Sequence, residues 1–166
     1  MRPLLAFPLA LAMVLCPVSF GQSSSPAQSS SAREKAAAVT YLFPEQVTID
    51  AGKPAAVDLH FKVADGLHIN SHEPHAEELI PTTISLPDST GVHLANATFP
   101  PGKDFTFAIN PNEKLNVYTG EFIVHTTIVS TKGEHLVQGT LHYQACNNAA
   151  CMPPHTIPVV LDVIAK

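Results

Sequence analysis

The chain has 166 residues, a length that allows one domain of ordinary size. Lys and Arg number 9 against 14 Asp and Glu, so the formal net charge is -5 at pH 7. Because no cluster of Lys and Arg is available to neutralise phosphates, the composition argues against a nucleic-acid partner.

The N-terminal segment has the features of a secretory signal peptide. Arg2 gives a positive start, the run Leu4–Leu15 is almost entirely apolar, and Pro17 ends it. The tripeptide Ser19-Phe20-Gly21 places small residues where a signal peptidase reads the chain. We predict a signal peptide over residues 1–21, because the run is shorter than the roughly 20 apolar residues of a membrane span. A retained membrane anchor is the alternative.

Removal of this segment changes the number of cysteines from three to two. Cys16 would be lost, and Cys146 and Cys151 would remain. A lipid anchor at Cys16 is less consistent with the sequence, since Leu15 is not the small residue that such a site needs. Two cysteines in an oxidising compartment are expected to bond to each other. We therefore expect a soluble mature protein in the periplasm or otherwise outside the cytoplasm.

The next segment differs in composition from the rest of the chain. Residues 22–37 are rich in Ser, Gln and Ala and carry almost no large apolar side chains, so they cannot offset the entropy of ordering. We predict a flexible linker there and one folded domain over residues 38–166, without an internal repeat.

Within that domain, apolar and polar residues alternate as in half-buried strands. The clearest case is the strand that carries Val57, Leu59, Phe61 and Val63 on one face and ends at Asp65-Gly66. Pro and Gly separate the apolar runs at intervals of roughly ten residues, and no segment shows a sustained helical period. This pattern predicts an all-β immunoglobulin-like antiparallel β-sandwich. Further strands are expected over residues 82–86, 92–99, 105–109, 121–129, 134–145 and 157–163.

The cysteine pair falls between the last two predicted strands. Asn147-Asn148 can form the turn between them, because Asn tolerates the left-handed region of backbone conformation. Such a turn can bring the two Cα atoms within the roughly 4.4–6.8 Å that a disulfide needs. From spacing alone, a structural bridge and an exchangeable bridge both remain open.

Physical chemistry favours the exchangeable bridge. The loop that it closes is so short that its entropic contribution is only about 2 kcal/mol, and a local bridge opens without unfolding a domain. Pro153 and Pro154 oppose a helix starting at Cys151, so no helix N-terminus is available to lower a thiol pKa. No Lys or Arg lies within about ten residues of the pair. We expect thiols of near-ordinary acidity whose reactivity depends on access.

The surrounding residues resemble a known family. The string Tyr143-Gln144-x-Cys146, followed after four residues by Cys151-x-Pro153-Pro154, is similar to the N-terminal domain of the thiol:disulfide interchange protein DsbD. The resemblance extends over residues 39–163. Upstream strings similar to the family, in the same order, are Asp65-Gly66-Leu67-His68-Ile69-Asn70-Ser71, Leu79-Ile80-Pro81-Thr82 and Val117-Tyr118-Thr119-Gly120-Glu121.

This resemblance implies a periplasmic domain whose cysteine pair takes electrons from a thioredoxin-like domain, itself supplied by a membrane-embedded domain. It implies delivery to periplasmic disulfide isomerases or to thioredoxins of cytochrome maturation. Neither further domain is present in this sequence, so we expect separate proteins to supply the electrons. By the same resemblance, Cys151 forms the mixed disulfide and Cys146 resolves it. A cap loop is expected within residues 100–111, with Phe105 as its aromatic residue.

We therefore predict a component of a thiol:disulfide oxidoreductase system that needs no cofactor. Tyr143, Gln144, Pro153 and Phe105 are expected around the cysteines, with the Tyr143 ring packed in the core. The first alternative is a non-enzymatic extracytoplasmic binding module with a structural disulfide.

A second alternative is a copper-binding protein that uses Cys151, Met152 and His155. Several other histidines lie close together in the sequence, and we expect them to be surface loop residues, with metal binding left open. These histidines are His60, His68, His72 and His75.

Overall fold

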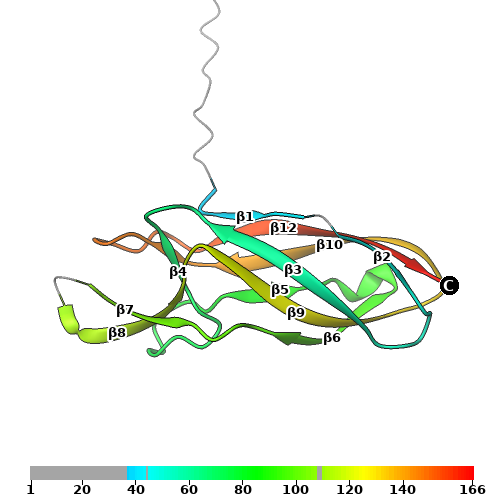
Figure 1. The fold of residues 1–166 in the computed structure, drawn as a ribbon, viewed down its shortest axis with the longest axis horizontal. Coiled ribbons are helices and arrows are strands. Elements are labelled where there is room, and N and C mark those ends of the chain that lie inside the picture. Colours follow the sequence, from blue (N-terminus) through cyan, green and yellow to red (C-terminus); the bar gives the residue numbers. More distant parts are fainter. Residues whose placement is uncertain (1–36, 44, 108–109) are drawn as a thin grey trace, which may run out of the picture. The chain divides into compact units, whose positions relative to one another are not determined.

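The computed structural model describes residues 37–43, 45–107 and 110–166 (Figure 1). The predicted signal peptide and all but residue 37 of the predicted linker lie outside these ranges. The described residues form twelve β-strands and one short 3-10 helix, Asp88–Thr90, with no α-helix among them.

The first sheet contains the strand with the clearest alternation. Strand β3 pairs antiparallel with β9, from Ala55 opposite Ile128 to Lys62 opposite Glu121. The inward residues of β3 become fully buried towards its end, where Phe61 is 0% exposed. The strands lie in the order β1-β3-β9-β6, with the bounds Val39–Tyr41, Ala55–Val63, Glu121–Ser130 and Val92–Thr98.

The second sheet is centred on β10 and β12. These strands pair antiparallel over their whole length, from Gly133 opposite Ala165 to Tyr143 opposite His155. Strand β2 joins the far edge of β12 in parallel, whereas the other strand pairs of the described fold are antiparallel. The order is β2-β12-β10-β5, with the bounds Glu45–Ile49, His155–Ala165, Gly133–Tyr143 and Thr83–Ser85.

The two sheets share one hydrophobic core. Phe61 and Val124 of the first sheet belong to the same buried cluster as Leu141 and Leu161 of the second, and all four are 0% exposed. Each such side chain stabilises the fold by about 1.5–3 kcal/mol relative to an exposed position. The predicted immunoglobulin-like β-sandwich is confirmed.

A third, smaller sheet is attached where β10 ends (Figure 1). Its strand order is β11-β4-β8-β7, with the bounds Ala145–Cys146, His68–Asn70, Asn110–Tyr118 and Lys103–Phe107. Two of the departures from the sequence predictions in this sheet affect the candidate site. The predicted strand 134–145 stops at Tyr143, and the chain then moves from the second sheet into β11.

The second departure is strand β8, which the sequence analysis did not anticipate. Its first half is polar, so alternation is visible only at Leu115 and Val117, which are each 1% exposed. Strands β7 and β8 occupy most of the segment 100–111 in which a cap loop was expected.

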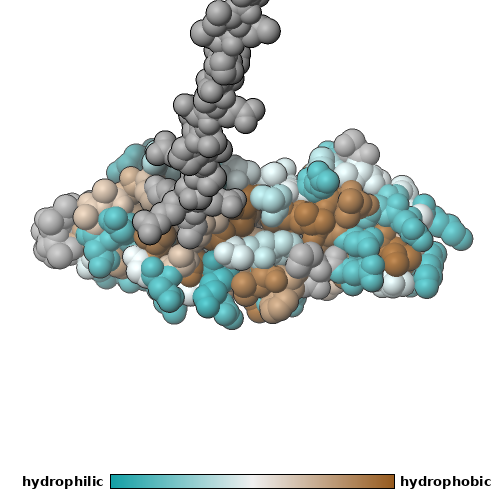
Figure 2. All heavy atoms as spheres, turned by 90° about the horizontal axis from the view of Figure 1, so that it is seen from above, coloured by the Kyte–Doolittle hydropathy of each residue, from teal (hydrophilic) through white to brown (hydrophobic). Residues whose placement is uncertain are grey.

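Figure 2 shows polar and apolar side chains interspersed over one face of the molecule. Among the described residues, the large apolar side chains with high exposure are Phe43 at 59% and Leu136 at 62%. The ring of Phe43 packs edge-on against His60, with 5.7 Å between the ring centroids.

Candidate functional site

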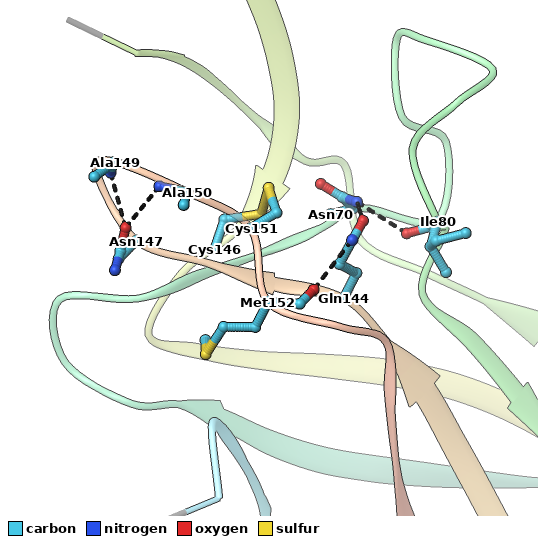
Figure 3. The surroundings of a disulfide bond; sticks show 9 residues. All are labelled: Asn70, Ile80, Gln144, Cys146, Asn147, Ala149, Ala150, Cys151 and Met152. Atoms are coloured by element: carbon cyan, nitrogen blue, oxygen red, sulfur yellow. Dashed lines mark hydrogen bonds between the residues drawn. A yellow bond between two sulfur atoms is a disulfide. The ribbon is translucent and has the colours of Figure 1, made fainter.

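Cys146 and Cys151 form a disulfide, with 2.07 Å between the Sγ atoms (Figure 3). The two residues face each other as an isolated antiparallel bridge, and their Cα atoms are 3.9 Å apart. This distance is below the predicted range and also below the Cα separation of about 4.5 Å that is usual for directly facing residues of an antiparallel pair. The sequence analysis found the pair but overestimated its separation.

The turn between the cysteines is held by the side chain of Asn147. Its Oδ1 accepts hydrogen bonds from the backbone N–H groups of Ala149 and Ala150, both at 2.8 Å, and its own N–H donates to the Ala150 carbonyl at 3.0 Å. No described residue other than glycine has a positive φ. The predicted left-handed Asn conformation is therefore wrong, and Asn147 shapes the turn through its amide oxygen instead.

The two cysteines differ sharply in exposure. Cys146 is 0% exposed because it lies in β11, which packs against β4, whereas Cys151 is exposed and follows a turn of exposed residues. Of the two cysteines, Cys151 is therefore the one that solvent can reach. The roles that the sequence resemblance implies for the two cysteines stay predictions.

A chain of amide hydrogen bonds fixes the strands on both sides of the disulfide (Figure 3). The Nδ2 of Asn70 donates to the Oε1 of Gln144 at 3.1 Å and to the Ile80 carbonyl at 3.0 Å. The Nε2 of Gln144 donates to the Met152 carbonyl at 3.1 Å. Gln144 thus interrupts the long strand predicted for this region and ties the cysteine turn to β4.

Asn70 is fully buried, yet its Oδ1 accepts no hydrogen bond. Buried polar atoms are nearly always paired, so an unpaired one needs an explanation. Here the NH2 group of Asn70 makes two hydrogen bonds, which fixes the orientation of the amide and leaves its oxygen unpaired. The sequence analysis did not single out Asn70, although a polar residue beside Ile69 in a short strand was an available signal.

His68 lies directly opposite Cys146 in the pairing of β4 with β11. Its side chain is buried, with 2% of the residue exposed, so the prediction of a surface histidine is wrong at this position. Its Nε2 is buried without a hydrogen-bond partner. Burial lowers the pKa of His68 below its ordinary value of 6.5, because the charged imidazolium loses its hydration.

The ring of His68 is covered by two phenylalanines from β7. Its centroid lies 4.1 Å from that of Phe105 and 6.0 Å from that of Phe107. Phe105, the residue expected in the cap, therefore packs on the histidine that faces Cys146. The sequence analysis identified Phe105 as a candidate site residue, but it gave no indication that His68 would lie beneath it.

Residues that flank the cysteines in the sequence help to line an apolar hollow of about 310 Å³. Its lining includes Leu67, Tyr143, Met152 and Pro153. The Tyr143 residue is 1% exposed and belongs to the core, as predicted, whereas Pro153 is exposed. This hollow places an apolar surface next to the exposed Cys151.

The remaining histidines are spread over the fold. His60 lies in β3, and the ring of His72 stacks on Phe99 with 4.2 Å between centroids. In the described part of the chain, no group of three or more His, Cys, Asp or Glu residues is placed to hold a metal ion. In the copper alternative, the Cys151 sulfur would be a ligand, but here it is bonded to Cys146.

The fold and the site together define the class of protein. It is a small immunoglobulin-like β-sandwich that carries a disulfide across a short turn. A family model described as thiol:disulfide interchange protein DsbD, N-terminal, matches residues 38–162. The chain therefore belongs to the family of the DsbD N-terminal domain, as the cysteine motif indicated.

Two solved structures are similar to this chain. The N-terminal periplasmic domain of ScsB from Proteus mirabilis has a TM-score of 0.52 and 16% identity, over 75% of this chain and 44% of that one. The reduced N-terminal domain of DsbD from Neisseria meningitidis has a TM-score of 0.45 and 20% identity, over 70% of this chain and 82% of that one. A comparison with individual curated proteins gave no match.

Among the residues that the structure describes, none lies in a helix long and apolar enough to cross a membrane.

Proposed function

We propose that this protein is a periplasmic thiol–disulfide exchange module that passes reducing equivalents between thioredoxin-like proteins. The reversible element is the Cys146–Cys151 bond. The observation that carries the proposal is the asymmetry of this bond, which joins a fully buried sulfur to an exposed residue through a short turn. Membership of the DsbD N-terminal family supports it.

The proposed reaction has two thiol–disulfide steps. A partner thiolate attacks the Sγ of Cys151, the Cys146–Cys151 bond breaks, and Cys146 leaves as a thiolate that takes up a proton. A second thiol of the partner then attacks the mixed disulfide, so that Cys151 is released and the partner is oxidised. The reduced pair transfers the two electrons onward when Cys151 attacks the disulfide of an acceptor and Cys146 resolves the product.

The partners are thioredoxin-like proteins or domains as donors and periplasmic disulfide isomerases or cytochrome maturation thioredoxins as acceptors. A membrane electron-transfer protein is proposed to supply the donor with electrons. Export by the predicted signal peptide is consistent with the related ScsB domain, which is described as periplasmic.

Phe105 is proposed to limit access to the site. Its ring covers His68, which faces Cys146, and the β7–β8 hairpin that carries it comes from a different part of the chain than the cysteine turn. In this proposal the hairpin covers the Cys146 side of the disulfide, whereas Cys151 stays exposed to a partner thiolate.

Trapping of a covalent intermediate tests the function and the role of each cysteine. The bait is a thioredoxin-fold protein that lacks its second active-site cysteine and carries its first as a mixed disulfide with thionitrobenzoate. The Cys146→Ser variant should displace thionitrobenzoate through Cys151 and give a stable complex on a non-reducing gel.

Cys151→Ser is the matched control, and it should give little complex because Cys146 is buried. Circular dichroism of both variants checks that they are folded. A complex formed only by Cys151→Ser would reverse the assigned roles. No complex with either folded variant would favour a binding module with a structural disulfide.

A further inference from the structure

Opening of the disulfide creates a chemical problem on the buried side. The sulfur of Cys146 leaves as an anion at a position with 0% exposure, where burial disfavours the charged thiolate because it loses its hydration. The closing reaction has the reverse problem, because the buried thiol of Cys146 must lose its proton before it can attack the mixed disulfide at Cys151. A nearby proton acceptor would accelerate this step.

His68 is placed to be that acceptor. Residues directly opposite each other in an antiparallel pair have Cβ atoms about 4.5–5.5 Å apart and side chains on the same face. The His68 side chain therefore shares a face with that of Cys146. Its buried Nε2 has no partner while the disulfide is closed, so this nitrogen is free to bind a new one when Cys146 becomes a thiol.

We propose that His68 exchanges a proton with Cys146 each time the disulfide closes or opens, an inference that rests on the proposed exchange function. In the closing step, the Cys146 thiol gives its proton to a neutral His68 nitrogen. The thiolate then attacks Cys151, a new Cys146–Cys151 bond forms, and the partner leaves as a thiolate. The imidazolium returns its proton to solvent, and the opening step is the reverse.

The surroundings of His68 suit this role. It lies opposite Cys146 of β11 in the strand pairing, and the uncharged rings of Phe105 and Phe107 of β7 pack near it. It also lines an open cavity of about 350 Å³, in which the one other ionisable side chain among the described lining residues is the exposed Asp65.

The other described residues that complete this lining come from the end of β3 and the loop before His68, from the β8–β9 turn and from the disulfide turn. They are Val63, Ala64, Gly66, Leu67, Thr119, Gly120 and Asn148. With its pKa lowered by burial, His68 is neutral near pH 7 and able to accept a proton, and the cavity offers a route for that proton to solvent.

If His68 had only a structural role, it would fill space beneath Phe105. The pH dependence of disulfide closure distinguishes this role from the proposed proton exchange. The fully reduced protein is mixed with excess 5,5′-dithiobis(2-nitrobenzoate). The first thionitrobenzoate is released when Cys151 is modified. The second is released by attack of Cys146 on Cys151, in a first-order step that does not depend on reagent concentration and is followed in a stopped-flow spectrometer.

The variants are His68→Phe, which keeps an aromatic ring in place, and His68→Gln, which keeps a polar side chain without a basic nitrogen. His93→Phe is the control, because His93 is an exposed histidine in β6. At pH 7, both His68 variants should close about 100-fold more slowly than the wild type, within the usual range for general base catalysis. The rates should converge at high pH, where hydroxide deprotonates Cys146 directly.

Two results would overturn the inference. One is a slowing of less than about threefold at pH 7 in a folded His68 variant. The other is an equal slowing at every pH, which is the signature of altered packing. This assay needs no protein partner, so its failure is distinguishable from failure of the proposed exchange function, which the trapping experiment tests.

Discussion

Reduction of the Cys146–Cys151 disulfide should leave the β-sandwich folded. The bridge joins residues only five positions apart, so in the chain-entropy model it stabilises the protein by about 2 kcal/mol. A domain of this size has a total stability of roughly 5–15 kcal/mol. The turn is also held without the bridge, since Asn147 accepts two backbone hydrogen bonds and the Met152 N–H donates to the Ala145 carbonyl at 2.8 Å.

The assay is thermal unfolding by circular dichroism, with and without a strong reductant. For a domain of this length, 1 kcal/mol corresponds to about 4 °C in Tm, so reduction should lower Tm by roughly 8 °C. The far-ultraviolet spectrum at 25 °C should not change. Unfolding at 25 °C on reduction would refute the reasoning. It would mean that the bridge is required for folding and cannot open while the domain stays folded.

Three further outcomes follow from single side chains. Replacing Asn147 with Ala removes the acceptor of two turn hydrogen bonds and should destabilise the reduced protein by about 1 kcal/mol in urea unfolding; an unchanged midpoint would contradict the role of its amide. Asn70→Ala leaves Gln144 and a backbone carbonyl without their donor and should cost about 2 kcal/mol in the same assay. The lowered pKa of His68 predicts a stability contribution that is present above pH 6.5 and lost as the pH falls below it, because the unfolded chain then binds the proton more readily. Urea unfolding should therefore show that the free energy of unfolding falls less between pH 7.5 and pH 5.0 in His68→Phe than in the wild type. An equal fall in both proteins would exclude His68 as its source.

The alternation of apolar and polar residues predicted those strands whose inward residues are all apolar. The face of Val57, Leu59, Phe61 and Val63 is visible in the sequence because every second residue is buried in one core. Strand β8 escaped prediction because its polar first half has no such alternation. The break at Gln144 was also invisible locally, since the partner of its side chain, Asn70, lies 74 positions away.

The candidate site was predictable to a similar degree. Cys146 and Cys151 could be identified from spacing, compartment and family resemblance, and Phe105 from the resemblance alone. The burial of His68 could not, because it results from tertiary pairing with β11 and from rings contributed by β7. A histidine in a short polar string has no local signal of burial, so the sequence favoured an exposed loop position.

The unequal exposure of the two cysteines also constrains how the proposed transfer between two partners would run. Of the two cysteines, Cys151 is the exposed residue, so in the proposed exchange an electron donor and an electron acceptor would use the same sulfur. They cannot do so together, and each has to depart before the other arrives. Steady-state kinetics with both partners should then be of the ping-pong type, and a saturating excess of either one should inhibit transfer to the other.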